Sequence, residues 1–250
     1  MTLPIIVIPA RMASTRLPGK PLADIGGKPM IVRVCERAVA AAMGPVLVAA
    51  AEREIADAVQ TAGFDAVMTD PALPSGSDRV HAALGIADPE GIHDLVVNLQ
   101  GDMPTLDPAA LQRLFRAMRA QPGAEIATLA AQITDPAERD DPNVVKAVLS
   151  FDKDAEAARA LYFTRATAPH GAGPLWHHVG VYAYRREALG RFVAAPPSHL
   201  EIQERLEQLR ALELGMVIAC AALTGPPPNG VDTPEDLEAA RAWYQREGIV

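Results

Sequence analysis

The sequence predicts an α/β fold in which a mainly parallel sheet is covered by helices on both faces. Its strand-like segments are short, continuous apolar runs, and amphipathic helix-like stretches separate one run from the next. Strands that are buried on both faces are typically continuous apolar runs, because the crossover helices between parallel strands cover both sides of the sheet. Such a sheet binds its ligands beyond the carboxyl ends of its strands.

The first half of the chain alternates strand and helix regularly. Expected strands lie at residues 5–9, 46–50, 66–68 and 95–99, with a further extended segment at 126–131. Expected helices lie between them, at residues 30–42, 55–62, 78–87 and 109–120. This alternation is typical of βαβ units.

After residue 140 the pattern changes, and crossover helices become fewer. Expected strands lie at 144–149, 160–164, 178–185 and 217–222, and we expect an antiparallel subdomain at about residues 140–200. A strong helix is expected at 201–214, where the apolar residues on one face are Ile202, Leu206, Leu209 and Leu212. The last helix, 234–244, is expected to be capped by Asp232 or Thr233.

Composition excludes several classes of protein. With 250 residues, of which 49% are hydrophobic and 22% charged, the chain suits one large globular domain. No apolar run approaches the roughly 20 residues of a membrane helix, and the first residues read as a buried strand and not as a signal peptide. The net charge of −8 argues against a general nucleic-acid binder. Cys35 and Cys220 suggest neither a disulfide framework nor a zinc site, which fits a reducing, cytoplasmic setting.

A basic loop follows the first strand. Residues 1–37 carry six basic side chains against two acidic ones, although the whole chain is acidic. Arg11, Arg16 and Lys20 lie around Gly19. The loop lacks the spacing of a P-loop and of a dinucleotide fingerprint, but cations and free amides at a strand end suit a triphosphate. The alternative is an ordinary basic surface loop.

Two further segments supply carboxylates. The expected strand at 95–99 runs into Gln100, Gly101 and Asp102, so that Asp102 follows a sharp turn at the carboxyl end of the strand. Asp232 precedes the last helix. Mg²⁺ typically takes one or two carboxylates together with substrate phosphates, so this pair would be sufficient. Each aspartate is alternatively a helix cap or turn residue, and for Asp232 alone the cap is the more common role.

Nine segments together resemble the 3-deoxy-manno-octulosonate (Kdo) cytidylyltransferase family. They are PARMASTRLPGKPL (9–22), GKPM (27–30), SGSDR (75–79), NLQGD (98–102), PNVVK (142–146), YFTRA (162–166), HVGVYAYR (178–185), LEQLR (206–210) and GVDTPEDL (230–237). They run in order through nearly the whole chain. The first loop is shared in part with other sugar nucleotidyltransferases, whereas LEQLR and YFTRA are more specific. The family usually has Glu where this chain has Met103.

The resemblance implies a Rossmann-like fold and a single nucleotidyltransferase domain over residues 1–250, in which about 140–200 form the antiparallel, dimerising part. It implies a cytoplasmic, Mg²⁺-dependent homodimer that joins CTP to Kdo, giving CMP-Kdo and pyrophosphate for lipopolysaccharide synthesis. No nucleic acid and no membrane is expected as a partner.

Roles for individual residues are also implied by the resemblance. Arg11 and Lys20 would grip the CTP phosphates with help from Arg16, and Asp102 and Asp232 would hold magnesium. The cytidine and sugar site would be lined by Ala10, Ser75, Gly76, Arg79 and Gln100. The carboxylate and hydroxyls of Kdo would be surrounded by Arg165, His178, Tyr182, Glu207 and Gln208. Without the resemblance, a histidine on such a strand is usually structural, and Arg165, Glu207 and Gln208 would usually face solvent.

Two alternatives remain at this stage. The same chemistry could serve another acid sugar, such as 8-amino-Kdo or a nonulosonate. The chain could instead be a catalytically lapsed relative that still binds nucleotide. Retention of Lys20, Asp102 and Asp232 speaks against such a loss, because phosphate and metal contacts would disappear first.

Overall fold

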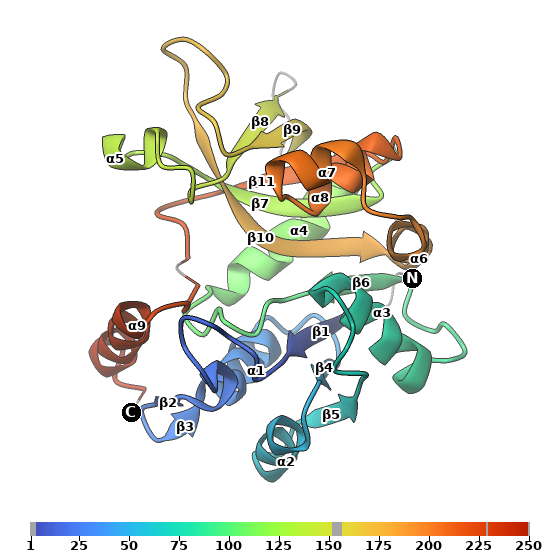
Figure 1. Cartoon of the computed structure of the whole chain (residues 1–250), viewed down its shortest axis with the longest axis vertical. Coiled ribbons are helices and arrows are strands. Elements are labelled where there is room, and N and C mark those ends of the chain that lie inside the picture. The colour runs from blue at the N-terminus through green and yellow to red at the C-terminus, as the bar shows by residue number, and fades with distance from the viewer. Residues whose placement is uncertain (1–3, 152–156, 229, 250) are drawn as a thin grey trace. The chain divides into compact units, whose positions relative to one another are not determined.

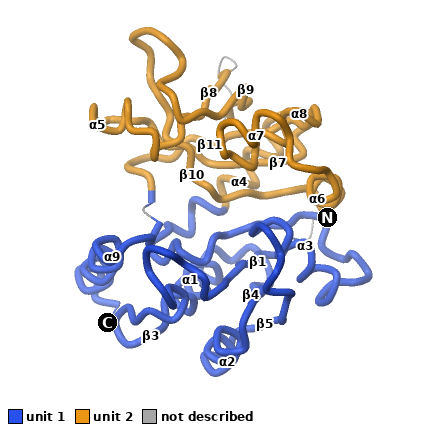
Figure 2. The backbone as a smooth tube through the Cα atoms, viewed as in Figure 1, with its two compact units in different colours: residues 1–111, 228–250 blue, residues 112–227 orange. Residues whose placement is uncertain are grey.

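The computed structural model describes residues 4–151, 157–228 and 230–249. The chain folds into two compact units, shown in Figures 1 and 2. Unit 1 comprises residues 1–111 and 228–250, and unit 2 comprises residues 112–227. The chain therefore leaves unit 1 within helix α4 (Pro108–Ala120) and returns to it before the last helix.

The sheet of unit 1 is parallel, and its strand order is β5-β4-β1-β6. Its strands are β1 (Pro4–Ala10), β4 (Val46–Ala50), β5 (Asp65–Met68) and β6 (Leu95–Asn98). Every residue of β4 and β6 is buried, as the continuous apolar runs predict. The chain runs outward from β1 to β4 and β5, and then crosses back to β6 on the other side of β1. This reversal makes the carboxyl ends of β1 and β6 a topological switch point, where α/β sheets bind ligands.

Helices cover this sheet on both faces. They are α1 (Met30–Ala40), α2 (Arg53–Thr61) and α3 (Gly76–Ala87). Because crossovers are right-handed, the two outward connections place α1 and α2 on one face, and the return connection places α3 on the other. Between β1 and α1 the chain forms a 3₁₀ turn, η1 (Lys20–Leu22), and a short hairpin of β2 (Asp24–Ile25) and β3 (Lys28–Pro29).

Helix α9 (Pro234–Arg246) closes unit 1 against the start of the chain. Its buried Leu237 and Tyr244 pack with Ile25 and Met30, and the Tyr244 hydroxyl donates a hydrogen bond of 2.8 Å to the carbonyl of Pro104. The helix begins with a capping box in which the Thr233 side chain accepts from the Asp236 N–H and the Asp236 carboxylate accepts from the Thr233 N–H. Thr233 is therefore the cap, which leaves Asp232 available for another role.

Unit 2 has a mixed sheet with the strand order β10-β7-β11-β9-β8. Its strands are β7 (Ile126–Gln132), β8 (Lys146–Ser150), β9 (Ala158–Thr164), β10 (Trp176–Arg185) and β11 (Ile218–Leu223). β7 and β11 are parallel, and the other pairings are antiparallel, including a contact between His177 of β10 and Lys146 of β8. The helices of this unit are α5 (Pro136–Arg139), α6 (Arg186–Ala194), α7 (His199–Glu204) and α8 (Gln208–Glu213).

The single helix expected at residues 201–214 is wrong. The chain breaks at Arg205, whose φ of 57° lies in the left-handed region, and so forms α7 and α8. Leu206 and Leu209 are buried as expected, but Ile202 is 65% exposed. The apolar spacing continues across the break, so periodicity alone could not reveal it. Helix α6 was not predicted.

The predicted fold class is confirmed: helices flank a mainly parallel sheet in unit 1, and antiparallel pairings occur in unit 2. The separate subdomain at 140–200 stays a prediction.

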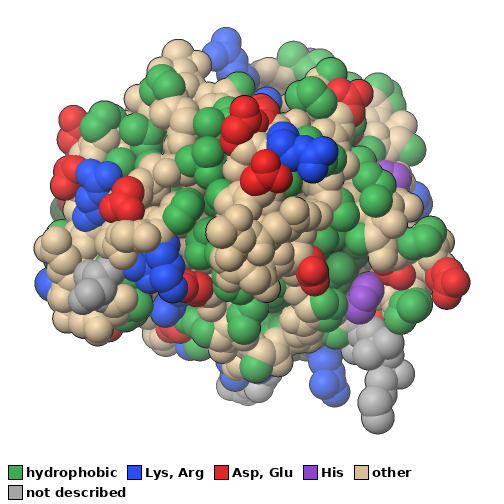
Figure 3. All heavy atoms as spheres, turned by 90° about the horizontal axis from the view of Figure 1, so that it is seen from below, with side chains coloured by type: hydrophobic (Ala, Val, Ile, Leu, Met, Phe, Trp, Pro, Cys, Tyr) green, Lys and Arg blue, Asp and Glu red, His purple; other side chains and the backbone are tan. Residues whose placement is uncertain are grey.

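Both cysteines are free and buried. Among the described residues, the helices are too short or too polar to cross a bilayer. On the face drawn in Figure 3, basic side chains are interspersed with acidic and apolar ones.

Candidate active site

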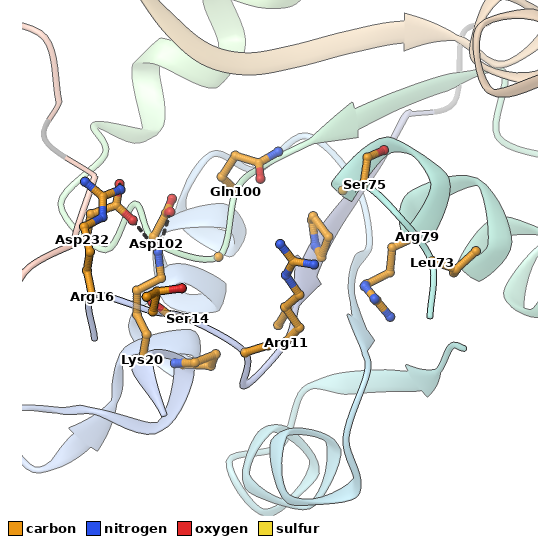
Figure 4. Close-up of a pocket in the computed structure, with 17 residues that line it drawn as sticks. Arg11, Ser14, Arg16, Lys20, Leu73, Ser75, Arg79, Gln100, Asp102 and Asp232 are labelled. Carbon is orange, nitrogen blue, oxygen red and sulfur yellow. Dashed lines mark hydrogen bonds and ion pairs between the residues drawn. The ribbon is translucent and has the colours of Figure 1, made fainter. Parts of the chain in front are cut away.

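A pocket of about 390 Å³ lies in unit 1 at the carboxyl ends of β1 and β6, where the topology places a ligand site (Figure 4). The loop after β1, the turn after β6, the start of α3 and the segment before α9 form its walls. The pocket brings together the residues that the sequence assigned to nucleotide and magnesium: Ala10, Arg11, Arg16, Lys20, Ser75, Gly76, Arg79, Gln100, Asp102 and Asp232. Their individual roles stay predictions.

One end of the pocket is built around the ammonium group of Lys20. Its Nζ donates to Asp102 Oδ2 at 2.8 Å and to Asp232 Oδ1 at 2.9 Å. The other oxygen of Asp232, Oδ2, accepts from Arg16 Nη2 at 2.8 Å. Burial lowers the pKa of Lys20, but the charges and hydrogen bonds of the two aspartates outweigh it, so that the pKa is raised overall. Lys20 is therefore a permanent cation at neutral pH.

Backbone contacts explain why the two aspartates meet. The N–H of Val231 donates to the carbonyl of Asp102 at 2.8 Å, which joins the segment before α9 to the turn after β6. Gly101 permits that turn, because a Cβ at this position would lie 3.0 Å from the carbonyl oxygen of Pro9 and 3.3 Å from Ile31 Cδ1. The glycine is needed for a close approach to β1.

The other end of the pocket carries Arg79, whose side chain is 2% exposed. Its Nη1 donates to Thr69 Oγ1 at 2.7 Å and to the carbonyl of Asp70 at 3.1 Å, while Nη2 has no hydrogen-bond partner among the described residues. Burial lowers the pKa of Arg79, although the nearby carboxylate of Glu52 opposes this. Buried donors are rarely left without a partner, so Nη2 of Arg79 is a candidate donor to a ligand in this pocket.

The start of α3 forms the wall beside Arg79. Ser75 caps the helix by accepting from the Asp78 N–H at 3.2 Å, and the N-terminal end of the helix dipole favours negative charge in the pocket. Figure 4 shows Arg79 and Ser75 at one end, the aspartates with Lys20 at the other, and Arg11 between them. The pocket thus combines several cationic groups with two carboxylates.

Only part of the basic N-terminal segment faces this pocket. Arg11, Arg16 and Lys20 line it, whereas Lys28 pairs with Glu36 on the surface. Arg33 is buried and donates to the carbonyls of Ile25 and Gly26, with its guanidinium over the ring of Tyr244. Arg37 donates to the carbonyl of Leu106. Charge counting alone could not separate these structural arginines from the cations that line the pocket.

Unit 2 carries the five residues assigned to the sugar acid, and two of them are in ring contact. The rings of His178 and Tyr182 lie 5.6 Å apart on β10. Burial raises the pKa of Tyr182 well above its usual value, and electrostatic interactions with Tyr184 and Glu207 raise it further. Tyr182 therefore stays a neutral phenol. Glu207 and Gln208, expected within a long helix, instead form the start of α8. His178 is buried, as the structural alternative also predicts.

Arg165 is held by backbone carbonyls. Its Nε donates to Glu204 at 3.0 Å and its Nη1 to Pro142 at 2.9 Å. The Glu204 carboxylate accepts from the Arg165 N–H and from the Thr164 hydroxyl, which ties the end of β9 to α7. The Arg165 side chain is therefore anchored through Nε and Nη1.

Sequence reasoning missed several residues that build these sites. Leu73 lines the pocket, Thr69 orients Arg79, and Glu204 orients Arg165. Leu73 is an apolar loop residue with no distinctive pattern around it. The role of Glu204 depends on the break at Arg205, which the helical periodicity concealed.

Comparison with known proteins identifies the family. The sequence model described as "Cytidylyltransferase" matches residues 5–218. The chain is 64% identical to the 3-deoxy-manno-octulosonate cytidylyltransferase of Parvibaculum lavamentivorans, over 98% of this chain and 94% of that protein. It is 62% identical to the enzyme of the same name from Rhodospirillum centenum, over 96% and 92% of the two chains. The chain belongs to the 3-deoxy-manno-octulosonate cytidylyltransferase family.

A solved structure of a family member agrees with this assignment. It is CMP:2-keto-3-deoxy-manno-octonic acid synthetase complexed with CTP, which is 40% identical and superposes with a TM-score of 0.88 over 98% of this chain and 100% of that one. The match extends through both units, so the family's fold is present over nearly the whole chain. Met103, where the family usually has Glu, is 8% exposed in the turn after Asp102.

The pocket suits a hard divalent cation. Asp102 and Asp232 offer carboxylate oxygens, the ligands that Mg²⁺ prefers, and they already share a positive charge from Lys20. Among the described residues no group of three or more His, Cys, Asp or Glu side chains is arranged for a metal. A cation at this position would therefore depend on phosphate oxygens for further ligands.

The close approach at Gly101 can be tested by adding one methyl group. Gly101→Ala should lower the free energy of unfolding by about 1–3 kcal/mol, because the Cβ meets the Pro9 carbonyl and Ile31. Gly85→Ala is the matched control. Gly85 lies in α3 with nothing within 4 Å of the added Cβ, so this change should raise stability by about 0.5–1 kcal/mol. Urea denaturation measures both, and a shift of the same sign in the two variants would contradict the close approach.

Proposed function

We propose that this chain transfers CMP from CTP to Kdo, releasing pyrophosphate. One observation carries the proposal: a single pocket at the switch point places Lys20 between two carboxylates and faces Arg11 and Arg79. A triphosphate requires several cations, and a magnesium nucleotide also requires one or two carboxylates. The names of the relatives, at 64% and 62% identity, support cytidine nucleotide and Kdo as the two substrates.

Phosphoryl transfer depends mainly on positioning and on stabilising charge. The anomeric hydroxyl of Kdo attacks the α-phosphate of CTP, and pyrophosphate leaves in line with it. Arg11, Lys20 and Arg16 bind the phosphates, while the unpartnered Nη2 of Arg79 and the start of α3 bind the rest of the nucleotide. Asp102 and Asp232 would hold Mg²⁺, which would neutralise charge on the triphosphate.

The ion pairs around Lys20 prepare the pocket for these charges. The two aspartates hold the ammonium at 2.8 and 2.9 Å. Phosphate oxygens of CTP would compete for the same ammonium, and Asp102 and Asp232 would then offer carboxylate oxygens to Mg²⁺. Lys20 thus keeps the two acidic groups from repelling each other.

The sugar acid is recognised in unit 2. The remaining donors of Arg165 pair with the Kdo carboxylate, since a guanidinium can bind a carboxylate in bidentate geometry. The hydroxyls of Kdo are bound by His178, Tyr182, Glu207 and Gln208.

The wider setting follows from the family. We propose a cytoplasmic, Mg²⁺-dependent homodimer whose product serves lipopolysaccharide synthesis. Exposed Leu161 on β9 and Phe151 after β8, at 54% and 46%, support a contact between copies in the 140–200 region. Sedimentation equilibrium measures that assembly directly.

A product assay tests the substrate assignment. The purified chain is incubated with CTP, MgCl₂ and a panel of acid sugars that includes Kdo, 8-amino-Kdo and a nonulosonate, and the products are identified by mass spectrometry. We expect CMP-Kdo and pyrophosphate as the preferred products. Preference for another acid sugar would identify that sugar as the substrate. Absence of turnover with every acid sugar in the panel would indicate a lapsed relative.

Removal of the Lys20 ammonium should strongly reduce turnover. A single charge-stabilising donor typically contributes about 2.7–4 kcal/mol to the barrier, so Lys20→Ala should reduce kcat by about 10²–10³-fold. Lys28→Ala is the control, because Lys28 pairs with Glu36 outside the pocket. Initial rates of pyrophosphate release measure both. Equal turnover in folded Lys20→Ala and Lys28→Ala proteins would disprove the role of Lys20.

Neighbouring substitutions separate metal binding from helix capping. Asp232→Asn should greatly reduce Mg²⁺-dependent turnover and raise the magnesium concentration needed for half-maximal rate. Thr233→Ala removes the cap of α9 and should lower the free energy of unfolding by about 1 kcal/mol, with the magnesium requirement unchanged. Magnesium titrations and urea denaturation of both variants measure the two effects. An unchanged magnesium requirement in Asp232→Asn would remove Asp232 from the metal site.

A further inference from the structure

A buried threonine contacts His178, one of the residues assigned to the sugar acid. Thr128 is on β7 with a relative exposure of 0%. Its Oγ1 is 3.0 Å from His178 Nε2, 3.2 Å from the carbonyl oxygen of Val179 and 3.0 Å from that of Val181. All three partners belong to β10, the strand that carries His178 and Tyr182.

The contacts coincide with an irregularity between β7 and β10. Val179 of β10 pairs with Leu129 of β7, and the next pair along the two strands is Tyr182 with Thr128. Gly180 and Val181 are therefore extra residues on β10. Bulges of this kind redirect side chains and often occur beside functional sites. The Thr128 hydroxyl lies at this bulge, within hydrogen-bond distance of the carbonyl oxygens of Val179 and Val181.

The hydroxyl has one proton, and that limits how its three contacts are made. The carbonyls of Val179 and Val181 can only accept, so the hydroxyl donates to one of them. The hydroxyl oxygen then accepts from His178, whose Nε2 must carry the proton. If Thr128 instead donated to Nε2, both buried carbonyls would lose this donor, which is unfavourable.

The surroundings of His178 fix the rest of its chemistry. Burial lowers the pKa of the imidazole to about 3, so the ring is neutral at physiological pH and carries a single proton. The imidazole ring packs against two aromatic rings. Its centroid is 4.8 Å from that of Phe163, in an edge contact, and 5.6 Å from that of Tyr182. With the proton on Nε2, the other nitrogen, Nδ1, has a lone pair and can only accept.

We propose that Thr128 is a positioning residue, which holds His178 as the Nε2–H tautomer and thereby presents Nδ1 as an acceptor for a hydroxyl group of the sugar acid. The inference rests on the proposed function, in which His178 contacts that substrate. It adds a chemical restriction: an Nδ1 lone pair binds a hydroxyl, which can donate, and does not bind a carboxylate, which cannot. His178 therefore reads a sugar hydroxyl, and recognition of the acid group belongs to other residues.

Two substitutions separate the hydroxyl of Thr128 from its shape. Thr128→Val keeps the branched side chain and removes the hydroxyl, whereas Thr128→Ser keeps the hydroxyl and removes a methyl group. We expect Thr128→Val to raise the KM for Kdo about tenfold, and Thr128→Ser to stay within about threefold of the natural protein. The KM for CTP should change little in both, because the nucleotide pocket is in unit 1. A larger effect in Thr128→Ser than in Thr128→Val would overturn the proposal.

The tautomer can be measured without substrate. In protein labelled with ¹⁵N-histidine, long-range ¹H–¹⁵N correlation spectra distinguish a protonated from an unprotonated ring nitrogen, and His178→Gln assigns the signal. We expect a protonated Nε2 and an unprotonated Nδ1 in the natural protein and in Thr128→Ser. A protonated Nδ1 in the natural protein would overturn the proposal, even if Thr128→Val failed to fold.

The outcomes also distinguish this inference from the proposed function. If the product assay identifies another sugar acid as the substrate, the proposed function fails for Kdo, and the KM comparison is made with that acid. If the spectra give the expected tautomer but Thr128→Val and Thr128→Ser leave the KM for the acid unchanged, Thr128 has no positioning role and this inference alone fails.

Discussion

The ammonium of Lys20 joins three parts of the chain that are far apart in sequence. It binds Asp102, 82 residues away, and Asp232, 212 residues away, at hydrogen-bond distance from both. These partly buried carboxylates would repel each other without a cation between them. The loop after β1, the turn after β6 and the segment before α9 therefore meet around one positive charge.

The geometry that makes this meeting possible comes from the sheet. In unit 1 the chain leaves β1 on one side and returns to β6 on the other, so the loops that follow these two strands lie next to each other. Helix α9 then adds the third segment, through the Val231–Asp102 hydrogen bond and the packing of Tyr244. Because Thr233 caps α9, the carboxylate of Asp232 is not used by the helix and can face Lys20.

Unit 2 orders its polar side chains in a different way, through buried hydrogen bonds to the backbone. Lys146 has a relative exposure of 0%, and its Nζ donates to the carbonyls of Asp141, Val144 and Arg165. Glu204 binds Thr164 and Arg165, and Thr128 binds His178 and the bulge in β10. Buried polar groups that are fully paired specify one arrangement. Two of the side chains assigned to the sugar acid, Arg165 and His178, are thus held by hydrogen bonds.

The sequence by itself determined the alternating strands and helices of unit 1 and the positions of the basic loop and the two aspartates that line the pocket. Continuous apolar runs specify buried strands such as β4 and β6, and the basic loop and the Gln100–Asp102 turn follow such strands directly. These features depend on neighbouring residues, which a sequence displays. The break at Arg205 was hidden because the apolar spacing of Leu206 and Leu209 continues across it.

Only the tertiary structure decided which polar residues act together. Six basic residues near the N-terminus look alike in sequence, yet Arg33 and Arg37 bind backbone carbonyls while Arg11 and Lys20 line the pocket. Asp232 and Thr233 were equivalent candidates for the cap, and the capping box with Asp236 selected Thr233. Thr128 carries no signal in sequence at all, since its role depends on a bulge in a strand fifty residues away. Such choices depend on distances between remote segments, and folding alone sets those distances.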